Sequence, residues 1–122
     1  MAIDNQVLGA AGERAAEELL AREGYVVLTR NYRWPGGEAD LVALDGLTLV
    51  FIEVKTRCND EHGTPFEAVT RRKRRRVTRT AQHYMLRHHL TDRAARFDVV
   101  GVWLEDGVLR CELIQDAFEA VE

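Results

Sequence analysis

Three carboxylates and a lysine lie on two runs of residues that otherwise have the composition of buried strands. Glu38 and Asp40 stand in the first run, and Glu53 and Lys55 stand in the second, 49–55. Ionised side chains are costly away from water unless a metal, a partner or a ligand compensates them. Charge in a core strand therefore suggests an active site. The competing interpretation is a fortuitous charge pair near a sheet edge.

These residue types suit the hydrolysis of a phosphodiester, which needs an activated water and charge stabilisation at an anionic phosphorus. A divalent magnesium or manganese ion can supply both, and magnesium binds through one or two carboxylates while keeping several waters. Asp40 and Glu53 are the candidate ligands. Lys55 could orient the attacking water or stabilise charge on the phosphoryl oxygens. Because no serine or cysteine nucleophile constellation is evident, direct attack by water is expected.

The turn between the two runs decides whether these side chains meet. Asp-Gly at 45–46, between apolar runs, predicts a type I′ hairpin turn. A loop centred there pairs Asp40 with Phe51 and Glu38 with Glu53, so Asp40 becomes a diagonal neighbour of Glu53 on the same face. The opposed Glu38 and Glu53 would then need a cation. A register shift by one residue would undo this convergence.

The surrounding elements are expected to form one α/β domain over residues 1–122, because 122 residues with 46% hydrophobic content can bury a sizeable core. An apolar stripe predicts a helix over 5–23, with Gly24 ending it. The other expected elements are strands beginning at 25 and spanning 38–44, 47–55, 97–104 and 108–114, a polar loop at 58–65 and a second helix at 66–89.

Several classes of protein are excluded by composition. No apolar run approaches the roughly 20 residues of a membrane helix, and the first five residues lack the form of a secretory signal. Cys58 and Cys111 are isolated thiols without the spacing of a metal site. The sequence therefore predicts a cytoplasmic protein with reduced cysteines and no membrane partner.

The net charge of −3 hides a strong asymmetry. Residues 71–96 hold ten of the 17 lysines and arginines and a single acid, Asp92. This split favours an oriented surface for a polyanion. The alternative is a solvated helix face. The centre of the basic segment is an unbroken run of six cations: Arg71, Arg72, Lys73, Arg74, Arg75 and Arg76.

Lys73 differs from the rest of this run. It lies four residues from both Val69 and Val77, on the expected buried stripe of the helix, so it should point inward. It could reach the active site or extend along the apolar surface to its edge.

Two further arginines flank the acidic cluster. Arg33 and Arg57 could each contact a phosphate through the planar guanidinium fork, or could simply neutralise the carboxylates. Glu38 could join the metal shell or hold a second ion, or could form a salt bridge with one of these arginines. Trp34, beside Pro-Gly, could stack on a base.

Asp40 followed by Glu53-Val54-Lys55 resembles the D…(D/E)-x-K signature of the restriction-endonuclease-like nuclease superfamily. Over nearly its whole length the chain is similar to the YraN-like family of small bacterial proteins, which are predicted endonucleases akin to archaeal Holliday junction resolvases. The motifs that carry this similarity are Gly12-Glu13, Gly24-Tyr25, Asn31-Tyr32-Arg33, Gly37-Glu38-x-Asp40-Leu41, Phe51-x-Glu53-Val54-Lys55-Thr56-Arg57, Gly63-x-Pro65, Ala68-Val69, Lys73, Arg96-Phe97-Asp98-Val99-Val100 and Ala117-Phe118.

The resemblance implies an αβββαβ core with a mixed central sheet flanked by helices. It also implies that the backbone carbonyl of Val54 is a third metal ligand, and that Glu13 on the first helix is an accessory metal residue unless it faces solvent. Ala39 stands where the family usually has isoleucine, and Asp116 where it usually has asparagine. Neither departure touches the expected ligands.

The resulting expectation is a magnesium- or manganese-dependent endonuclease acting on DNA, with branched DNA as the substrate by analogy. The rival is a nucleic-acid-binding protein that retains the nuclease fold without cutting. RNA is not excluded as a substrate. Symmetric cutting of two strands would favour a twofold homodimer.

Overall fold

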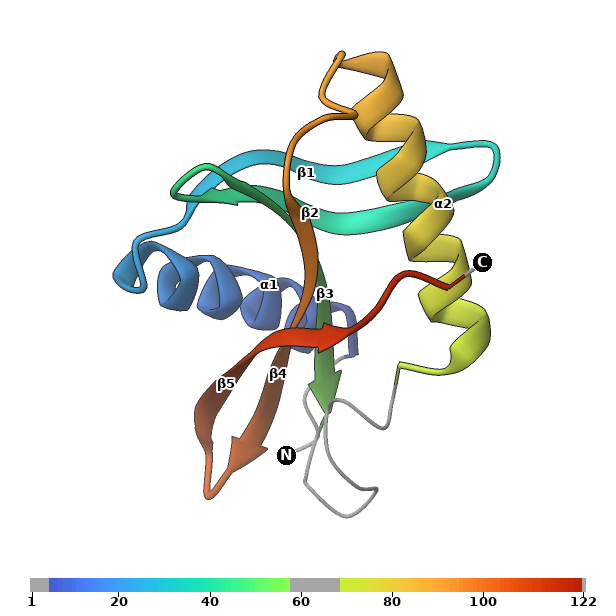
Figure 1. Ribbon diagram of the computed structural model, residues 1–122. Coiled ribbons are helices and arrows are strands. Elements are labelled where there is room, and N and C mark those ends of the chain that lie inside the picture. Colours follow the sequence, from blue (N-terminus) through green and yellow to red (C-terminus); the bar gives the residue numbers. More distant parts are fainter. Residues whose placement is uncertain (1–4, 58–68, 122) are drawn as a thin grey trace.

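The computed structural model describes residues 5–57 and 69–121, which form a five-stranded mixed sheet with a helix on each face (Figure 1). Strands are ordered β1-β2-β3-β4-β5, and all neighbours are antiparallel except β3 and β4, which α2 connects as a parallel crossover. This is the expected α/β class, compatible with a restriction-endonuclease-like core. The elements are α1 (Asn5–Arg22), β1 (Val26–Trp34), β2 (Gly37–Asp45), β3 (Thr48–Arg57), α2 (Arg71–Arg87), β4 (Ala95–Glu105) and β5 (Val108–Phe118).

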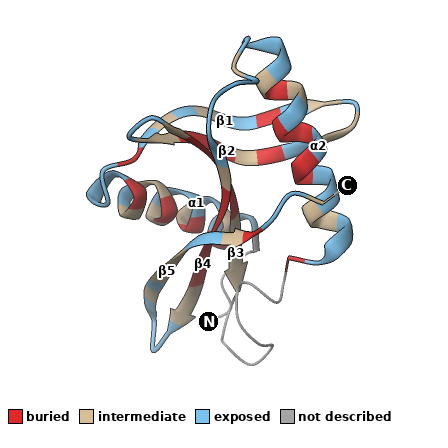
Figure 2. Ribbon diagram, viewed as in Figure 1, coloured by how far each residue is buried: buried red, intermediate tan, exposed pale blue. Residues whose placement is uncertain are grey.

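Two apolar layers sandwich the sheet, because successive side chains of a strand point to opposite faces. On β3, Phe51 packs beneath α2 with Tyr84, and Ile52 packs beneath α1 with Leu20. Buried residues accordingly follow the strands and the inner sides of both helices (Figure 2). At Gly12, α1 approaches β3 so closely that an added methyl group would collide with Thr56.

The helix ends follow their capping signals. Helix α1 ends one residue before the predicted position, and Gly24 adopts the expected positive φ of +89°. Helix α2 is shorter than predicted, since Thr70 caps it by accepting a hydrogen bond from the Lys73 amide at 3.2 Å. The first residues of the predicted helix, 66–68, and the predicted polar loop lie outside the described residues.

The predicted register of the β2–β3 hairpin is wrong by two residues. Asp45 pairs with Thr48, so the turn consists of Gly46 and Leu47, and Phe51 faces Val42 instead of Asp40. Gly46 has a φ of +61°, as the first position of a type II′ turn requires. A tertiary contact explains the difference. The carboxylate of Asp45 binds the guanidinium of Arg96 on β4 at 2.7 Å, and this contact keeps Asp45 in the strand.

The type I′ turn occurs instead at the β4–β5 hairpin. Asp106 and Gly107 there have φ values of +51° and +78°, and Glu105 pairs with Val108 across them. The right-handed twist of the flanking strands matches this turn. Strand β5 then runs to Phe118, four residues beyond the predicted end.

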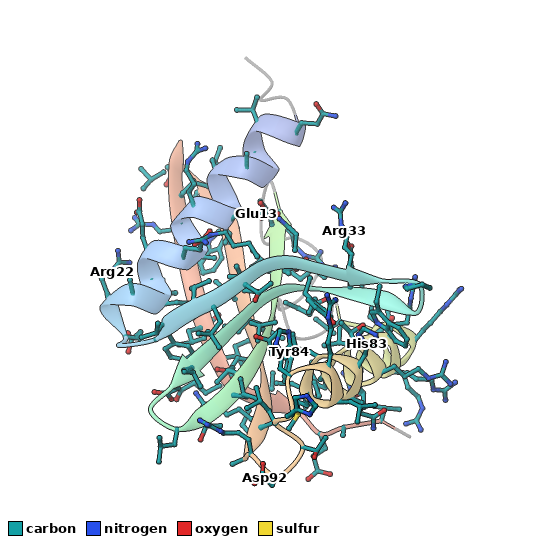
Figure 3. All side chains as sticks on the ribbon, turned by 90° about the horizontal axis from the view of Figure 1, so that it is seen from above. Glu13, Arg22, Arg33, His83, Tyr84 and Asp92 are labelled. Atoms are coloured by element: carbon teal, nitrogen blue, oxygen red, sulfur yellow. The ribbon has the colours of Figure 1, made fainter. Side chains whose placement is uncertain are left out.

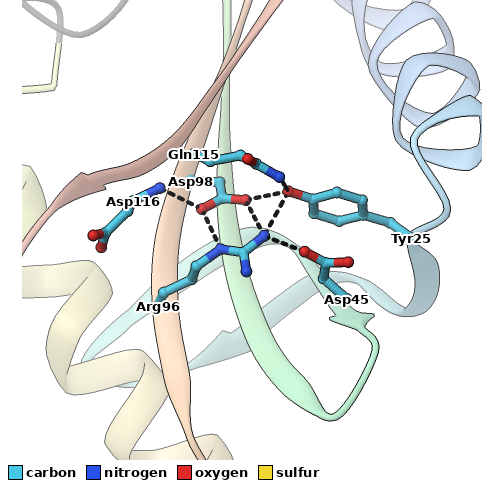
Figure 4. A network of polar contacts seen from close by, with 6 residues as sticks. All are labelled: Tyr25, Asp45, Arg96, Asp98, Gln115 and Asp116. Atoms are coloured by element: carbon cyan, nitrogen blue, oxygen red, sulfur yellow. Dashed lines mark hydrogen bonds and ion pairs between the residues drawn. The ribbon is translucent and has the colours of Figure 1, made fainter.

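The extra length of β5 is held by a buried polar network (Figure 4). Asp98 is fully buried. Its carboxylate accepts hydrogen bonds from Arg96 Nε at 3.1 Å, the Tyr25 hydroxyl at 2.6 Å and the Asp116 amide at 2.9 Å. Gln115 donates to the Tyr25 hydroxyl at 2.9 Å. These contacts fix the bulge at which β5 rejoins β4.

In the described part of the chain, neither helix has the length and apolar character needed to cross a membrane.

Candidate active site

The candidate site lies where β2 separates from β3. The last residue pair between these strands is Leu41 with Ile52. Beyond it, the Val54 amide donates to Asp40 Oδ2 at 2.8 Å, and the Asp40 amide donates to Glu53 Oε2 at 3.2 Å. Buried backbone amides need partners, so two carboxylates replace the hydrogen bonds that the sheet loses at this fork. Their side chains are thereby fixed side by side.

A cavity of about 410 Å³ opens in front of this carboxylate pair. Glu53 and Lys55 reach it from the same face of β3, with one residue between them, and Asp40 reaches it from β2. A two-residue error in register preserves which face a side chain occupies, so the three residues meet despite the incorrect turn. The remaining wall consists of Arg33, Trp34, Pro35, Gly37, Glu38, Val54, Lys73, Arg76 and Val77.

Burial raises the pKa of both carboxylates. Glu53 is only 6% exposed, and burial, with the adjacent charge of Asp40, raises the pKa of Glu53 from its usual 4.5 to about 8. Burial likewise raises the pKa of Asp40, although its hydrogen bond from Val54 opposes this. The charge of Lys73 favours the ionised form of both groups. The pair thus binds protons readily unless another cation replaces them.

The donor set fits a hard divalent cation. Two carboxylates at the edge of an open cavity leave room for bound waters, which magnesium usually keeps. Val54, expected to supply its carbonyl, also lines the cavity. Within residues 5–57 and 69–121, no three His, Cys, Asp or Glu side chains come together as a metal site. Asp40 and Glu53 therefore form a two-carboxylate set, without the third side chain that a closed structural site would have.

Glu38 is not opposite Glu53, so the expected pairing of like charges is wrong. Its Oε2 instead lies 3.1 Å from Arg33 Nε, and both side chains are exposed, by 57% and 74%. The salt bridge, one of the two alternatives for Glu38, is therefore present. Its charge still contributes to raising the pKa of Asp40.

Glu13 lies on the other side of Asp40. It is an exposed residue of α1 (Figure 3), and it lines a small separate cavity with Glu17, Arg30 and Asp40. Arg30 is bound to Glu17 there at 2.7 Å. Asp40 thus separates a basic cavity beneath α2 from an acidic one beside α1.

The run of six cations divides according to the helix geometry. Lys73 is half-buried, and it and Arg76 line the cavity of the carboxylates, as the inward position of Lys73 predicted. Arg74 turns to the opposite flank, donates to the Val69 carbonyl at 2.9 Å and lies over the ring of Phe118. Arg74 therefore packs against the fold on this flank and does not line the cavity of the carboxylates. Arg76 is exposed although it lines the cavity, and so are Arg71, Arg72 and Arg75.

The two flanking arginines differ in position. Arg33 lines the cavity through its place near the tip of the β1–β2 hairpin. Arg57 ends β3, is half-buried and is not among the residues lining this cavity. The structure therefore brings Arg33 to the candidate site and does not place Arg57 in the lining of its cavity.

Sequence reasoning missed the contact that holds the hairpin against α2. Trp34 donates to the Thr80 hydroxyl at 2.9 Å and stacks on His83 with ring centroids 4.4 Å apart. The Tyr32 hydroxyl lies 2.8 Å from His83 Nδ1. Trp34 thus packs against α2 while also lining the cavity, and His83 is half-buried. The i, i+3 spacing of Thr80 and His83 was the available signal.

The raised pKa of Glu53 predicts a pH-dependent stability in the absence of metal. Between about pH 4.5 and 8 the folded state holds a proton that the unfolded state has lost, so the free energy of unfolding should fall as pH rises. Glu53→Gln removes the part of this dependence that comes from Glu53. We expect the variant to lie within about 1 kcal/mol of wild type near pH 5 and to exceed it by roughly 4 kcal/mol near pH 8.

Urea denaturation at several pH values, with a chelator present, measures this difference. Glu23→Gln is the control, because this exposed carboxylate beyond the end of α1 does not contribute to the raised pKa of either carboxylate and should leave the pH profile unchanged. Parallel pH profiles for wild type and Glu53→Gln would contradict the prediction.

Comparison with known proteins identifies relatives that match nearly the whole length of this chain. The profile of the "Uncharacterised protein family UPF0102" matches residues 12–102. The chain is 52% identical over 114 residues to a UPF0102 protein of Symbiobacterium thermophilum, covering 93% of this chain and 97% of that protein. It is 50% identical over 112 residues to one of Moorella thermoacetica, covering 90% and 93%. For one of Geobacter metallireducens, identity is 41% over 119 residues, covering 98% of each.

Proposed function

The chain belongs to the UPF0102 family, and from the site that it carries we propose that it is a metal-dependent endonuclease that hydrolyses DNA. The observation that carries this proposal is the pair of buried Glu53 and half-buried Asp40, fixed at the fork of β2 and β3 and facing a cavity with four cationic side chains. Carboxylates suit a divalent metal, and the surrounding cations suit a phosphodiester. The four cationic residues are Arg33, Lys55, Lys73 and Arg76.

The roles of the residues follow from their positions. Asp40, Glu53 and the Val54 carbonyl would hold magnesium or manganese, which when bound polarises the phosphoryl oxygen and acidifies a water. Lys55 orients that water or stabilises charge on the phosphoryl oxygens. Lys73 and Arg76, from the facing helix, hold the non-bridging oxygens of the substrate. Water attacks the phosphorus directly: its oxygen forms a new P–O bond and gives up a proton to solvent, while the P–O bond to the leaving oxygen breaks and that oxygen takes up a proton from solvent.

The kind of DNA and the place of action are inferred from the resemblance to known nucleases. The D…(D/E)-x-K residues occupy adjacent strands of a mixed sheet, as they do in restriction-endonuclease-like nucleases, and the YraN-like motifs run along the same chain. By this analogy we propose branched DNA as the substrate and the cytoplasm as its place of action. Likeness of fold alone does not establish an activity, so the chemistry of the site carries the greater part of the proposal.

The second candidate function is the binding of nucleic acid without cleavage. The basic α2 supports it, but binding alone does not require a lysine beside two adjacent carboxylates, one buried and one half-buried. Such a protein would show salt-sensitive binding to DNA without metal-dependent turnover.

The decisive experiment offers linear, flapped and four-way DNA to the protein with magnesium or manganese. We expect cleavage by wild type and none by Asp40→Asn, which keeps the shape of the side chain but removes its charge. Glu38→Gln is the control, because this residue forms an exposed salt bridge and should retain most activity. Binding without cleavage by wild type on every substrate would favour the second candidate, and equal cleavage by Asp40→Asn would exclude this site.

A further inference from the structure

The exposed face of α2 carries a stripe of arginines that extends beyond the basic run. Arg72, Arg76 and Arg79 recur at intervals of four and three residues, and Arg75 stands four residues before Arg79. Residues with this spacing are neighbours on one side of a helix. All four are exposed, and Arg76 also lines the cavity of the carboxylates. The stripe therefore passes the mouth of the candidate active site.

The length of the stripe matches a short piece of nucleic-acid backbone. From Arg72 to Arg79 the helix rises about 10 Å, which corresponds to about three nucleotides at 3.4 Å per nucleotide of one strand. Helix α2 contains no acidic residue that could neutralise these arginines. Their neighbour Arg74 is bound on the other flank, so the exposed stripe is one-sided.

The chemistry of the stripe favours phosphates over bases. Arginine forks bind phosphate oxygens in a bidentate manner, and contacts to phosphates position a nucleic acid without reading its sequence. The charge on the other side of Asp40 has the opposite sign, because Glu13 and Glu17 lie there and Arg30 is bound to Glu17. A phosphate backbone is therefore attracted over α2 and repelled beside α1.

We propose that four arginines of α2 form a track that binds the phosphate backbone of one DNA strand independently of its sequence. The members of the track are Arg72, Arg75, Arg76 and Arg79. Arg76, at the cavity, directs the bound strand to the carboxylate pair. This inference rests on the proposed function, and it adds Arg79, the direction of approach and the absence of sequence reading. Because contacts to phosphates carry no sequence information, the track positions DNA at the carboxylate pair without reading its bases.

The test measures binding to two labelled duplexes of equal length and unrelated sequence, with a chelator present so that neither is cut. Arg75→Ala/Arg79→Ala should lower the slope of log affinity against log salt by about 1.8, at about 0.9 for each lost phosphate contact, equally for both duplexes. The matched control is Arg14→Ala/Arg22→Ala, which removes two exposed arginines from α1 on the other face of the sheet and should leave the slope unchanged.

Equal slopes for the two double variants would overturn the track, as would a preference of more than about tenfold for one duplex. These outcomes are separate from failure of the proposed function. If the track variants lose binding but wild type never cleaves with metal, only the nuclease proposal fails. If wild type cleaves and Asp40→Asn does not, while the track variants bind like wild type, only the track fails.

Discussion

Replacing Lys55 with methionine is expected to lower the rate of DNA cleavage about 100- to 1,000-fold while metal binding remains. Lys55 shares its cavity with the carboxylate pair, on the same face of β3 as Glu53. Methionine keeps most of the length of the side chain and removes the ammonium group. Loss of one group that stabilises charge in the transition state typically costs this much. Metal affinity should stay equal or increase, because a positive charge near the cation is gone.

Single-turnover cleavage and calorimetric titration with manganese measure the two effects separately. Lys73→Met is the matched control, since this lysine enters the same cavity from α2. We expect it to weaken DNA binding more than the chemical step. A Lys55→Met protein that cleaves within about fivefold of wild type would show that the ammonium group does not act in the reaction.

Replacing Asp98 with alanine is expected to destabilise the fold by about 3–5 kcal/mol, the usual result of removing one member of a buried ion pair. Asp98 is fully buried, and its loss would leave Arg96 and the Asp116 amide without their shared acceptor. The Tyr25 hydroxyl would lose its 2.6 Å bond as well. The end of β5 should separate from β4 first, because this network fixes the bulge there.

Urea denaturation at neutral pH measures the loss, and hydrogen exchange of the β5 amides locates it. Glu17→Ala is the control, because it removes an ion pair with Arg30 whose arginine is 61% exposed and should cost less than about 1 kcal/mol. Replacing both partners, Arg96→Met with Asp98→Leu, should restore part of the stability, since no unpaired charge remains buried. A loss below about 1 kcal/mol for Asp98→Ala would contradict this account.

Local signals in the sequence were sufficient for most elements of the fold. Both helices and all five strands lie where periodicity and turn residues placed them, with boundaries that differ by a few residues. Larger errors occurred where distant residues compete for a local group. Asp45 has the sequence of a type I′ turn but is held in its strand by Arg96, 51 residues away. Strand β5 is prolonged because Asp98 binds the Asp116 amide.

For the candidate site, residue types and strand alternation were sufficient to predict that Asp40, Glu53 and Lys55 meet on one face, although the predicted pairing of β2 with β3 was wrong. The reason is that a shift of two residues leaves each side chain on its own face. Helical spacing identified Lys73 as the inward member of the basic run, but it did not distinguish Arg76 from Arg74. Only the position of α2 over the sheet places Arg76 at the cavity and packs Arg74 against Phe118.

The sequence by itself determined the α/β class, the chemical character of the carboxylate–lysine cluster and the asymmetry of charge, since these depend on composition and local periodicity. The tertiary structure alone decided the fork at which the Asp40 and Glu53 side chains replace backbone hydrogen bonds, and the fixing of the β1–β2 hairpin to α2 through Trp34 and Thr80. Both depend on contacts between residues far apart in the chain, whose geometry is set by packing that no local pattern records.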